Sequence, residues 1–171
     1  MINKDILLGI DIGTTGAKCT FYDFSCNVLA SGYQEYRMLY PQVGWVEQDP
    51  QKWWSSVCEN IQNCIENYSI DASRVACIAV SSTNAVMLMG KDEKVVYNAI
   101  GLHDKRAEDQ VTWLKNHVGE EKIFEITGNK IVKGSFALPT LRWFIDNRPD
   151  LIEKAEKFLI PNGFIIKKLD H

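Results

Sequence analysis

The sequence has no long hydrophobic run and no strong excess of charge of either sign. It contains no stretch of ~18 apolar residues that would predict a transmembrane helix, and residues 1–5 show no charged-then-apolar start of a signal peptide. The formal net charge of −3 gives no electrostatic reason to expect nucleic acid or an anionic membrane as a partner. We therefore expect a cytoplasmic protein that binds neither.

Cysteine and histidine are also scarce. The three histidines show no metal-ligand spacing with one another or with cysteine, and the five cysteines form an odd set with no Cys-x-x-Cys pair. We expect free, buried thiols rather than disulfides or a zinc site. There is no internal repeat or low-complexity tract. With 46% hydrophobic and 24% charged residues, the chain of 171 residues is expected to form one globular domain with one core.

Residues 7–18 carry the most informative pattern, an apolar strand that runs into an acid and then a tight turn rich in glycine and threonine. Glycine lets the backbone approach an anion, while backbone N–H groups and threonine hydroxyls donate to phosphate oxygens. Asp11 suits a hydrated Mg²⁺. The spacing fits neither a Walker A loop nor a dinucleotide fingerprint. Lys18 either adds positive charge to this phosphate site or is only a solvent-exposed residue of the next strand. The candidate phosphate ligands are Gly13, Thr14, Thr15 and Lys18.

The glycine turn is followed by a predicted hairpin. Residues 18–23 and 28–33 alternate in polarity, with a polar connection between them, so the turn joins two antiparallel strands. This arrangement resembles the first phosphate loop of the actin-like ATPase superfamily, which includes sugar kinases; an ordinary Gly-Thr hairpin turn is the alternative. The resemblance implies an α/β, ribonuclease H-like fold whose mixed sheet has an antiparallel N-terminal hairpin and flanking helices.

The segment of residues 44–54 places tryptophan, two acids and a proline before an amphipathic run. Asp49 is a good N-cap, with Pro50 at the first helical position. With the preceding Asp-x-Gly-Thr-Thr, this Gly-Trp-Val-Glu-Gln-Asp-Pro-x-x-Trp-Trp segment resembles the FGGY carbohydrate kinase family, in its xylulokinase-like branch. The spacing predicts a helix that buries one face, made by Trp54, Val57, Cys58, Ile61, Cys64 and Ile65.

Residues 75–84 are predicted to be a buried strand that delivers polar residues at its C-terminal end, where open α/β sheets place ligands. In xylulokinase-like members those positions contact the sugar. This chain departs from the family's Gln-Met-His-Gly at that point. Thr83 and Asn84 still donate and accept hydrogen bonds, so they are candidate sugar ligands, but the departure means that the identity of the sugar does not transfer.

Residues 98–106 resemble the family segment Ala-Ile-x-Trp-x-Asp-x-Arg, whose Asp-x-Arg lies at the floor of the sugar pocket. Leu102 stands where the tryptophan is expected, and it keeps an apolar wall without the flat aromatic face. We carry over Asp104 and Arg106 as candidate substrate-binding residues. The alternative is structural, with Asp104 as the N-cap of a helix beginning near residue 105 and Arg106 as its partner.

Residues 136–149 resemble a further helical segment of the family, with Thr140 in place of the usual lysine. Pro149 ends the helix, and Trp143 is expected in the core. Residues 158–166 resemble the family's next strand and helix. The predicted buried face of the first helix is made by Leu138, Leu141, Phe144 and Ile145.

The resemblance covers most of the first of two actin-like domains. It implies in-line transfer of the ATP γ-phosphoryl group, with Mg²⁺, to a sugar hydroxyl, most readily that of a ketopentose such as xylulose, with glycerol, gluconate or another polyol as rivals. In the family, the catalytic base and most of the adenosine pocket lie in the C-terminal domain, which is absent here. We therefore expect an N-terminal fragment that is inactive alone, and leave open a homodimer of the full-length enzyme. A non-catalytic sugar sensor and a nucleotide-switched scaffold are the alternatives.

Overall fold

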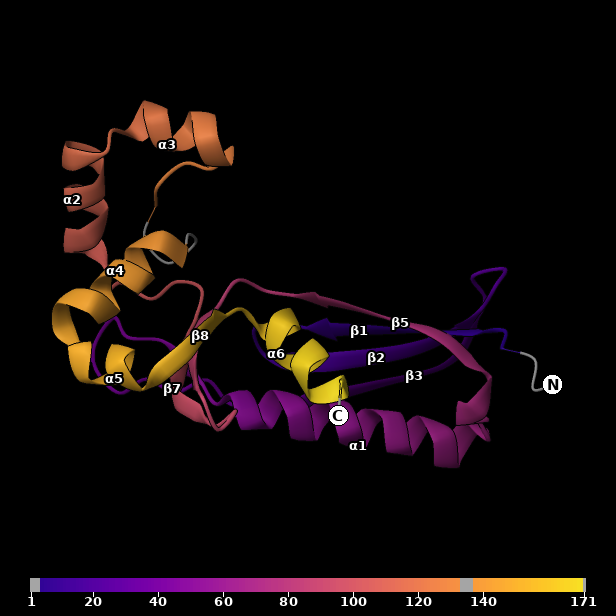
Figure 1. Ribbon diagram of the computed structural model, residues 1–171. Coiled ribbons are helices and arrows are strands. Elements are labelled where there is room, and N and C mark those ends of the chain that lie inside the picture. Colours follow the sequence, from indigo (N-terminus) through magenta and orange to yellow (C-terminus); the bar gives the residue numbers. More distant parts are fainter. Residues whose placement is uncertain (1–3, 133–136, 171) are drawn as a thin grey trace. The chain divides into compact units, whose positions relative to one another are not determined.

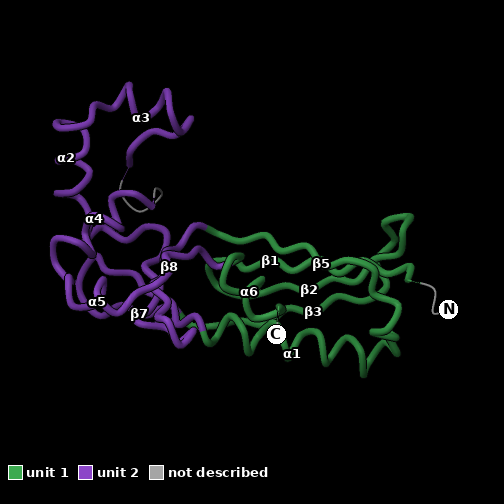
Figure 2. The backbone as a smooth tube through the Cα atoms, in the orientation of Figure 1, with its two compact units in different colours: residues 1–37, 51–83, 162–171 green, residues 38–50, 84–161 purple. Residues whose placement is uncertain are grey.

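A computed structural model describes residues 4–132 and 137–170. It divides into two compact units (Figure 2): unit 1 comprises residues 1–37, 51–83 and 162–171, and unit 2 comprises residues 38–50 and 84–161. Among the described residues, no helix has the length and apolar character needed to cross a membrane. Phe136, the first residue of the second helical segment compared above, lies outside the described residues.

Unit 1 is built on a four-stranded mixed sheet (Figure 1). Strands β1 and β2 pair antiparallel, as do β2 and β3, while β5 runs parallel to β1 on its other side. The predicted hairpin and the mixed sheet are therefore confirmed. The order is β3-β2-β1-β5, with the strands at Ile6–Ile12 (β1), Gly16–Asp23 (β2), Val28–Glu35 (β3) and Val75–Ser82 (β5).

One face of this sheet is covered by helices. Every second residue of β1, from Ile6 to Ile12, is buried, which is the alternation expected of a strand with one covered face. Trp53 and Phe164, from two different helices, pack edge to face with ring centroids 6.1 Å apart. The helices are α1 (Pro50–Tyr68), which begins at Pro50 as predicted, and α6 (Pro161–Leu169); a short 3₁₀ turn, η1 (Ala72–Arg74), precedes β5.

The predicted buried face of α1 is correct at Val57 and Cys64 and wrong at its edge. Trp53 is fully buried, whereas Trp54 is half-buried and Cys58 is exposed. The cause is a polar residue on the inner face: Asn60 is 2% exposed and its Nδ2 donates to the carbonyl oxygen of Ala17, 2.9 Å away. Counting apolar residues alone misses a helix face fixed by such a bond.

The strand predicted within residues 75–84 forms as β5, but the prediction that it is buried is wrong. In the sheet as described, β5 is an edge strand, so most of its residues are exposed, including Ile78 at 42%. The same geometry exposes Cys77. All five cysteines are free, as predicted, but only Cys19 and Cys64 are buried.

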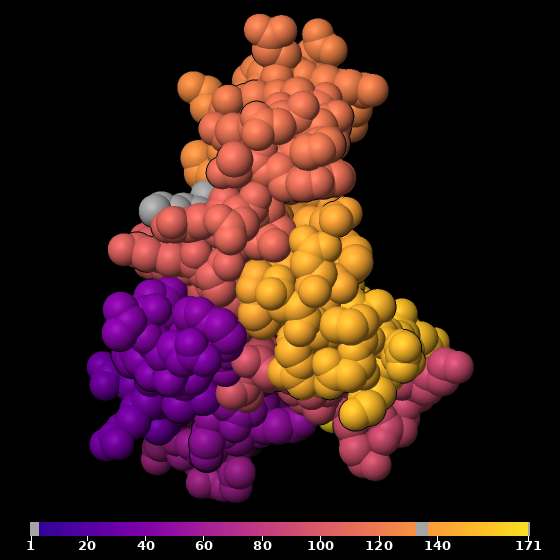
Figure 3. Space-filling model, turned by 90° about the vertical axis from the view of Figure 1, so that its left-hand side faces the viewer, coloured from indigo at the N-terminus to yellow at the C-terminus, as the bar shows by residue number. Residues whose placement is uncertain are grey.

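Unit 2 contains an entirely antiparallel four-stranded sheet in the order β4-β7-β6-β8. Its principal core is formed by a cluster that includes Leu88, Trp143 and Phe144. The side chains of α2 and α3 appear in orange in the face shown in Figure 3. The elements are β4 (Glu47–Gln48), β6 (Val86–Gly90), β7 (Val95–Ile100), α2 (Glu108–His117), α3 (Glu120–Thr127), α4 (Ala137–Asn147), α5 (Pro149–Lys154) and β8 (Ala155–Leu159).

In α4, the prediction that Trp143 belongs to the core is confirmed, with 7% of its surface exposed. Of the predicted inner face, Phe144 is buried as expected and Leu141 is half-buried, but Leu138 and Ile145 are 38% and 48% exposed. The helix turns toward the edge-to-face contact between Trp143 and Trp45, whose ring centroids are 5.5 Å apart. Large aromatic rings bury more area than the leucine and isoleucine left outside. The buried residues are Pro139, Thr140, Trp143 and Phe144.

Candidate functional site

The phosphate-cradle candidate is a tight turn between β1 and β2. The N–H of Gly13 donates to the carbonyl oxygen of Gly16 at 2.9 Å, which closes the turn around two threonines. A Cβ at Gly16 would lie 2.5 Å from the Tyr33 ring and 2.7 Å from the carbonyl oxygen of Gln34. Glycine is thus required at residue 16 by close approach, not only by turn geometry.

The threonine hydroxyls of the turn face polar neighbours. Thr14 Oγ1 lies 3.4 Å from Thr83 Oγ1, and Thr15 Oγ1 lies 3.4 Å from the hydroxyl of Tyr33. The N–H of Thr83 donates to the carbonyl oxygen of Ile12 at 2.7 Å, which ties the end of β5 to the end of β1. The structure therefore brings Thr83 beside the predicted phosphate turn.

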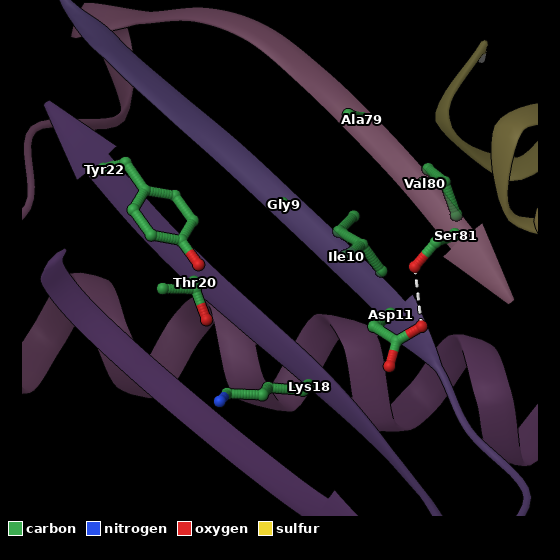
Figure 4. Close-up of a pocket in the computed structure, with 9 residues that line it drawn as sticks. All are labelled: Gly9, Ile10, Asp11, Lys18, Thr20, Tyr22, Ala79, Val80 and Ser81. Atoms are coloured by element: carbon green, nitrogen blue, oxygen red, sulfur yellow. Dashed lines mark hydrogen bonds between the residues drawn. The ribbon is translucent and has the colours of Figure 1, made fainter. Parts of the chain in front are cut away.

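Asp11 lies beside a cavity of about 340 Å³ on the open face of the sheet (Figure 4). Ser81 Oγ donates to Asp11 Oδ1 at 2.6 Å, so one carboxylate oxygen is held by β5. Lys18 is paired with Asp11 in the strand register, but its ammonium points away from the carboxylate in Figure 4. The cavity is lined by Gly9, Ile10, Asp11, Lys18, Thr20, Tyr22, Ala79, Val80 and Ser81.

Tyr36 is a site residue that sequence reasoning missed. Its hydroxyl donates to the carbonyl oxygen of Gly13 at 2.6 Å and also lies 3.1 Å from that of Gly16. Its backbone N–H donates to the carbonyl oxygen of Thr15 at 3.1 Å. A tyrosine just after a predicted hairpin carries no motif signal, and only the return of β3 alongside β2 brings it to the turn.

In unit 2, Asp104 and Arg106 form a buried ion pair. Arg106 Nε donates to Asp104 Oδ1, and Arg106 Nη2 to Asp104 Oδ2, both at 2.9 Å. The Asp104 carboxylate also accepts the N–H of Val46 at 2.6 Å and the N–H of Arg106 at 2.9 Å. Arg106 is thus the partner of Asp104. The N-cap interpretation of Asp104 is wrong, because α2 begins at Glu108 with Ala107 as its N-cap.

Glu47 is the second carboxylate of this network, and motif reasoning gave it no role. Its Oε1 accepts from Arg106 Nη2 at 2.9 Å and from the hydroxyl of Tyr97 at 2.7 Å, while Oε2 accepts from Asn98 Nδ2 at 3.1 Å. The side chains of Arg106, Asp104 and Glu47 are 1%, 2% and 3% exposed. The place of Glu47 two residues after Trp45, inside the tryptophan motif, was the signal available in the sequence.

Two indole rings complete the surroundings of Arg106. Its guanidinium carbon lies 3.8 Å from the ring centroid of Trp45 and 5.1 Å from that of Trp143, which are cation–π distances. Burial lowers the pKa of Arg106, but the bonds to Asp104 and Glu47 outweigh it and raise the pKa above its usual value. Burial, together with the bond to Glu47, raises the pKa of Tyr97. The network keeps Arg106 charged and fixes residues 44–48 against the loop that follows β7.

The candidate sugar ligands are divided between the units. Thr83 belongs to unit 1, and Asn84, Asp104 and Arg106 belong to unit 2. Thr83 and Asn84 are half-buried. His103 is exposed, and its φ of +74° places it in the left-handed region, which non-glycine residues adopt rarely.

Among the described residues, no cluster of three or more histidine, cysteine or acidic side chains could hold a metal ion. A lone carboxylate such as Asp11 fits Mg²⁺ nevertheless, because this ion keeps several waters and takes its other ligands from substrate phosphates. Only Oδ1 of Asp11 is bonded to Ser81, and Asp11 is exposed.

Solved structures resemble this chain closely in fold. A xylulose kinase from Lactobacillus acidophilus has a TM-score of 0.83 at 26% identity and covers 95% of this chain and 33% of its own. A gluconate kinase from the same species has a TM-score of 0.82 at 26% identity, covering 94% of this chain and 32% of its own. The fold is that of the actin-like ATPases, as predicted.

Sequence comparison defines the family. The model of the FGGY family of carbohydrate kinases, N-terminal domain, matches residues 6–171, and this chain belongs to that family. A glycerol kinase from Thermococcus kodakarensis is 34% identical over 155 residues, which are 90% of this chain and 31% of that protein. The chain thus spans about a third of the length of the curated relatives it matches.

Proposed function

We propose that the chain supplies the phosphate-binding part, and one side of the acceptor site, of a kinase that transfers the γ-phosphoryl group of ATP to a hydroxyl of a sugar or polyol. The observation that carries the proposal is the closed Gly13–Gly16 turn beside the Asp11 carboxylate, in a chain of the carbohydrate kinase family. Such a reaction depends mainly on positioning and on neutralising charge.

Within this proposal, Asp11 holds Mg²⁺ through water, while Gly13, Thr14 and Thr15 contact phosphate oxygens. Mg²⁺ in such a complex neutralises charge on the phosphates. Lys18 lies in the same cavity as Asp11 and adds positive charge there. Ser81 holds one oxygen of Asp11, which leaves the other directed toward the ion's water shell.

On the acceptor side, Thr83 and Asn84 orient the sugar hydroxyls. Asp104 and Arg106 act on the acceptor through the loop of unit 2 that they hold, because both side chains are buried and bonded to each other. A ketopentose such as xylulose is the first acceptor candidate, supported by the xylulose kinase among the solved neighbours. Glycerol is the second, favoured by the 34% identity to a glycerol kinase. The catalytic base comes from the remainder of the enzyme, whose closure excludes water that competes for the phosphoryl group.

The test is ADP release with Mg-ATP across ketopentoses, aldonates, glycerol and other polyols. It compares this chain with the protein read in frame beyond residue 171. Acceptor-dependent turnover only in the longer protein is the expected result. Asp11→Ala should reduce that turnover at least about a hundredfold, because an ion-positioning charge is lost. Asp23→Ala, at the exposed hairpin turn, is the control.

The proposal would be contradicted if the longer protein released no ADP with any of the acceptors. If it nevertheless bound sugar with an affinity unaffected by Mg-ATP, the sensor interpretation would replace it. Nucleotide-dependent sedimentation of filaments would favour a scaffold. Full turnover by Asp11→Ala would remove Asp11 from the metal site.

A further inference from the structure

Three carbonyl oxygens of the Gly13–Gly16 turn meet one residue, Tyr36. Tyr36 bonds the carbonyl of Gly13 through its hydroxyl and that of Thr15 through its backbone N–H, and its hydroxyl also approaches the carbonyl of Gly16. A tyrosine hydroxyl has one proton, so the 2.6 Å contact to Gly13 is the principal bond and the 3.1 Å contact is secondary.

Tyr36 lies just beyond the end of β3. Gly16 pairs with Glu35, and the N–H of Tyr36 donates to the carbonyl oxygen of Thr15, so the backbone of Tyr36 continues the pairing of β3 with β2. This pairing holds the Tyr36 ring beside the turn, where its hydroxyl meets the Gly13 carbonyl.

The direction of one peptide group follows from this. In a trans peptide, the C=O of one residue and the N–H of the next point in opposite directions. Because the Gly13 carbonyl points to the Tyr36 hydroxyl, the N–H of Thr14 points away from that hydroxyl. The reversed peptide would lose the bond to Tyr36 and put a carbonyl oxygen where the N–H now lies, and a carbonyl oxygen repels a phosphate; glycine at residue 13 offers little steric resistance to such a reversal.

We propose that Tyr36 is a positioning residue for phosphate binding, whose hydroxyl fixes the orientation of the Gly13–Thr14 peptide in the turn. The proposal rests on the phosphate-binding role proposed above for the turn, and it adds a residue outside the glycine-threonine motif. Tyr36 itself does not touch the phosphate. Burial raises the pKa of Tyr36, with Tyr33 and Asp11 adding to the shift, so the hydroxyl keeps its proton at neutral pH.

The test is amide NMR spectroscopy of this chain, without ligand and during titration with magnesium pyrophosphate. Tyr36→Phe removes only the hydroxyl; Tyr68→Phe, at the exposed end of α1, is the matched control. In the ligand-free spectra, Tyr36→Phe should move the amide resonances of residues 13–16, and Tyr68→Phe should not. In the titration, Tyr36→Phe should weaken pyrophosphate binding about fivefold, because one hydrogen bond that favours the binding conformation is lost.

Ligand-free turn resonances unchanged by Tyr36→Phe would overturn the positioning role. Changed resonances with an unchanged dissociation constant would also overturn it, because the lock would then have no effect on the anion. If the Thr14 amide of the unaltered chain did not respond to pyrophosphate while Tyr36→Phe still altered the turn, the phosphate role of the turn would be wrong, and not the contact itself.

A second measurement needs no variant. With tyrosine labelled at Cζ, the Tyr36 resonance should titrate at higher pH than tyrosine in an unstructured peptide, because burial raises its pKa. Titration of Tyr36 at the ordinary pH of tyrosine would show that its hydroxyl is not buried against the turn, and would overturn the proposal.

Discussion

Arg106 is a buried cation enclosed by two carboxylates and two indole rings. Its side chain is 1% exposed, and two of its nitrogens each donate to a carboxylate at 2.9 Å. Buried pairs of this kind are costly to break, because removal of one partner leaves an uncompensated charge away from water. The network therefore holds residues 44–48 rigidly against the loop that follows β7.

Arg106→Met should destabilise the protein by about 3–5 kcal/mol, since Asp104 and Glu47 would remain buried without their cation. Arg148→Met is the matched control, because Arg148 pairs with Asp150 where the side chains are 38% and 52% exposed. Its loss should cost no more than about 1 kcal/mol. Urea denaturation of both variants checks the difference. Equal free energies of unfolding for the two variants would mean that Arg106 is not bonded to Asp104 and Glu47 in solution.

Ser81 gives a functional prediction at the same scale. Ser81→Ala removes the 2.6 Å bond to Asp11 and leaves the carboxylate free to rotate. In the longer, active protein we expect turnover to fall about tenfold with little change in the apparent affinity for the acceptor. Steady-state kinetics with the acceptor and Mg-ATP varied separately measure this. The neighbouring exposed Cys77→Ala should leave both parameters unchanged, and a loss in it as large as in Ser81→Ala would deny the serine a specific role.

At the scale of elements, α1 is fixed to the hairpin by a polar contact as well as by its apolar face. Asn60 Nδ2 donates to the carbonyl oxygen of Ala17, and a Cβ at Gly32 would lie 2.9 Å from Asn60 Oδ1. The helix therefore approaches β3 closely where the strand carries glycine. This contact is made at Ala17, the residue that follows the Gly13–Gly16 turn, so α1 holds the strand that leaves the turn.

Asn60→Ala should destabilise the protein by about 1–3 kcal/mol, because the Ala17 carbonyl would stay buried without its donor. Asn63→Ala, on the exposed side of the same helix, is the control, since both changes gain the same helix propensity. Thermal unfolding followed by circular dichroism compares them. A melting temperature for Asn60→Ala equal to that of Asn63→Ala would show that the bond contributes nothing.

Across the whole molecule, the reactivity of each cysteine thiol depends on how deeply it is buried. Cys26, Cys58 and Cys77 are exposed, whereas Cys19 and Cys64 are buried. Burial raises the pKa of Cys19 to about 12 and also raises that of Cys64. The thiolate is the reactive form of cysteine. Cys19 and Cys64 are therefore protected from thiol reagents both by burial and by a raised pKa, which keeps the thiol protonated.

A disulfide reagent at pH 8 should label the three exposed cysteines of the native protein quickly and Cys19 and Cys64 only after denaturation. Because the folded pKa of Cys19 is raised, its contribution to stability is complete below the unfolded pKa and is lost as the pH rises from ~9 toward the folded value of about 12. Mass spectrometry of labelled peptides identifies the sites. Rapid native labelling of Cys19 would contradict the described core of unit 1.

The amino-acid sequence by itself determined the class of fold and the position of the Gly13–Gly16 turn. Glycine, threonine and aspartate at the end of a strand have few other uses in that spacing, and the alternation of residues 18–33 fixes the hairpin. The start of α1 at Pro50 was also predictable, because proline favours the first helical position, whereas the helix expected from about residue 105 begins at Glu108.

Only the tertiary structure decided which side chains meet across the sequence. Tyr36 reaches Gly13 over 23 residues, and Arg106 reaches Glu47 over 59, so neither pair leaves a local pattern. The inner face of α1 was misjudged because Asn60, a polar residue, is held inside by a backbone carbonyl of another strand. Periodicity reports the average polarity of a face, whereas a buried hydrogen bond is a single long-range contact that forms only when the chain has folded.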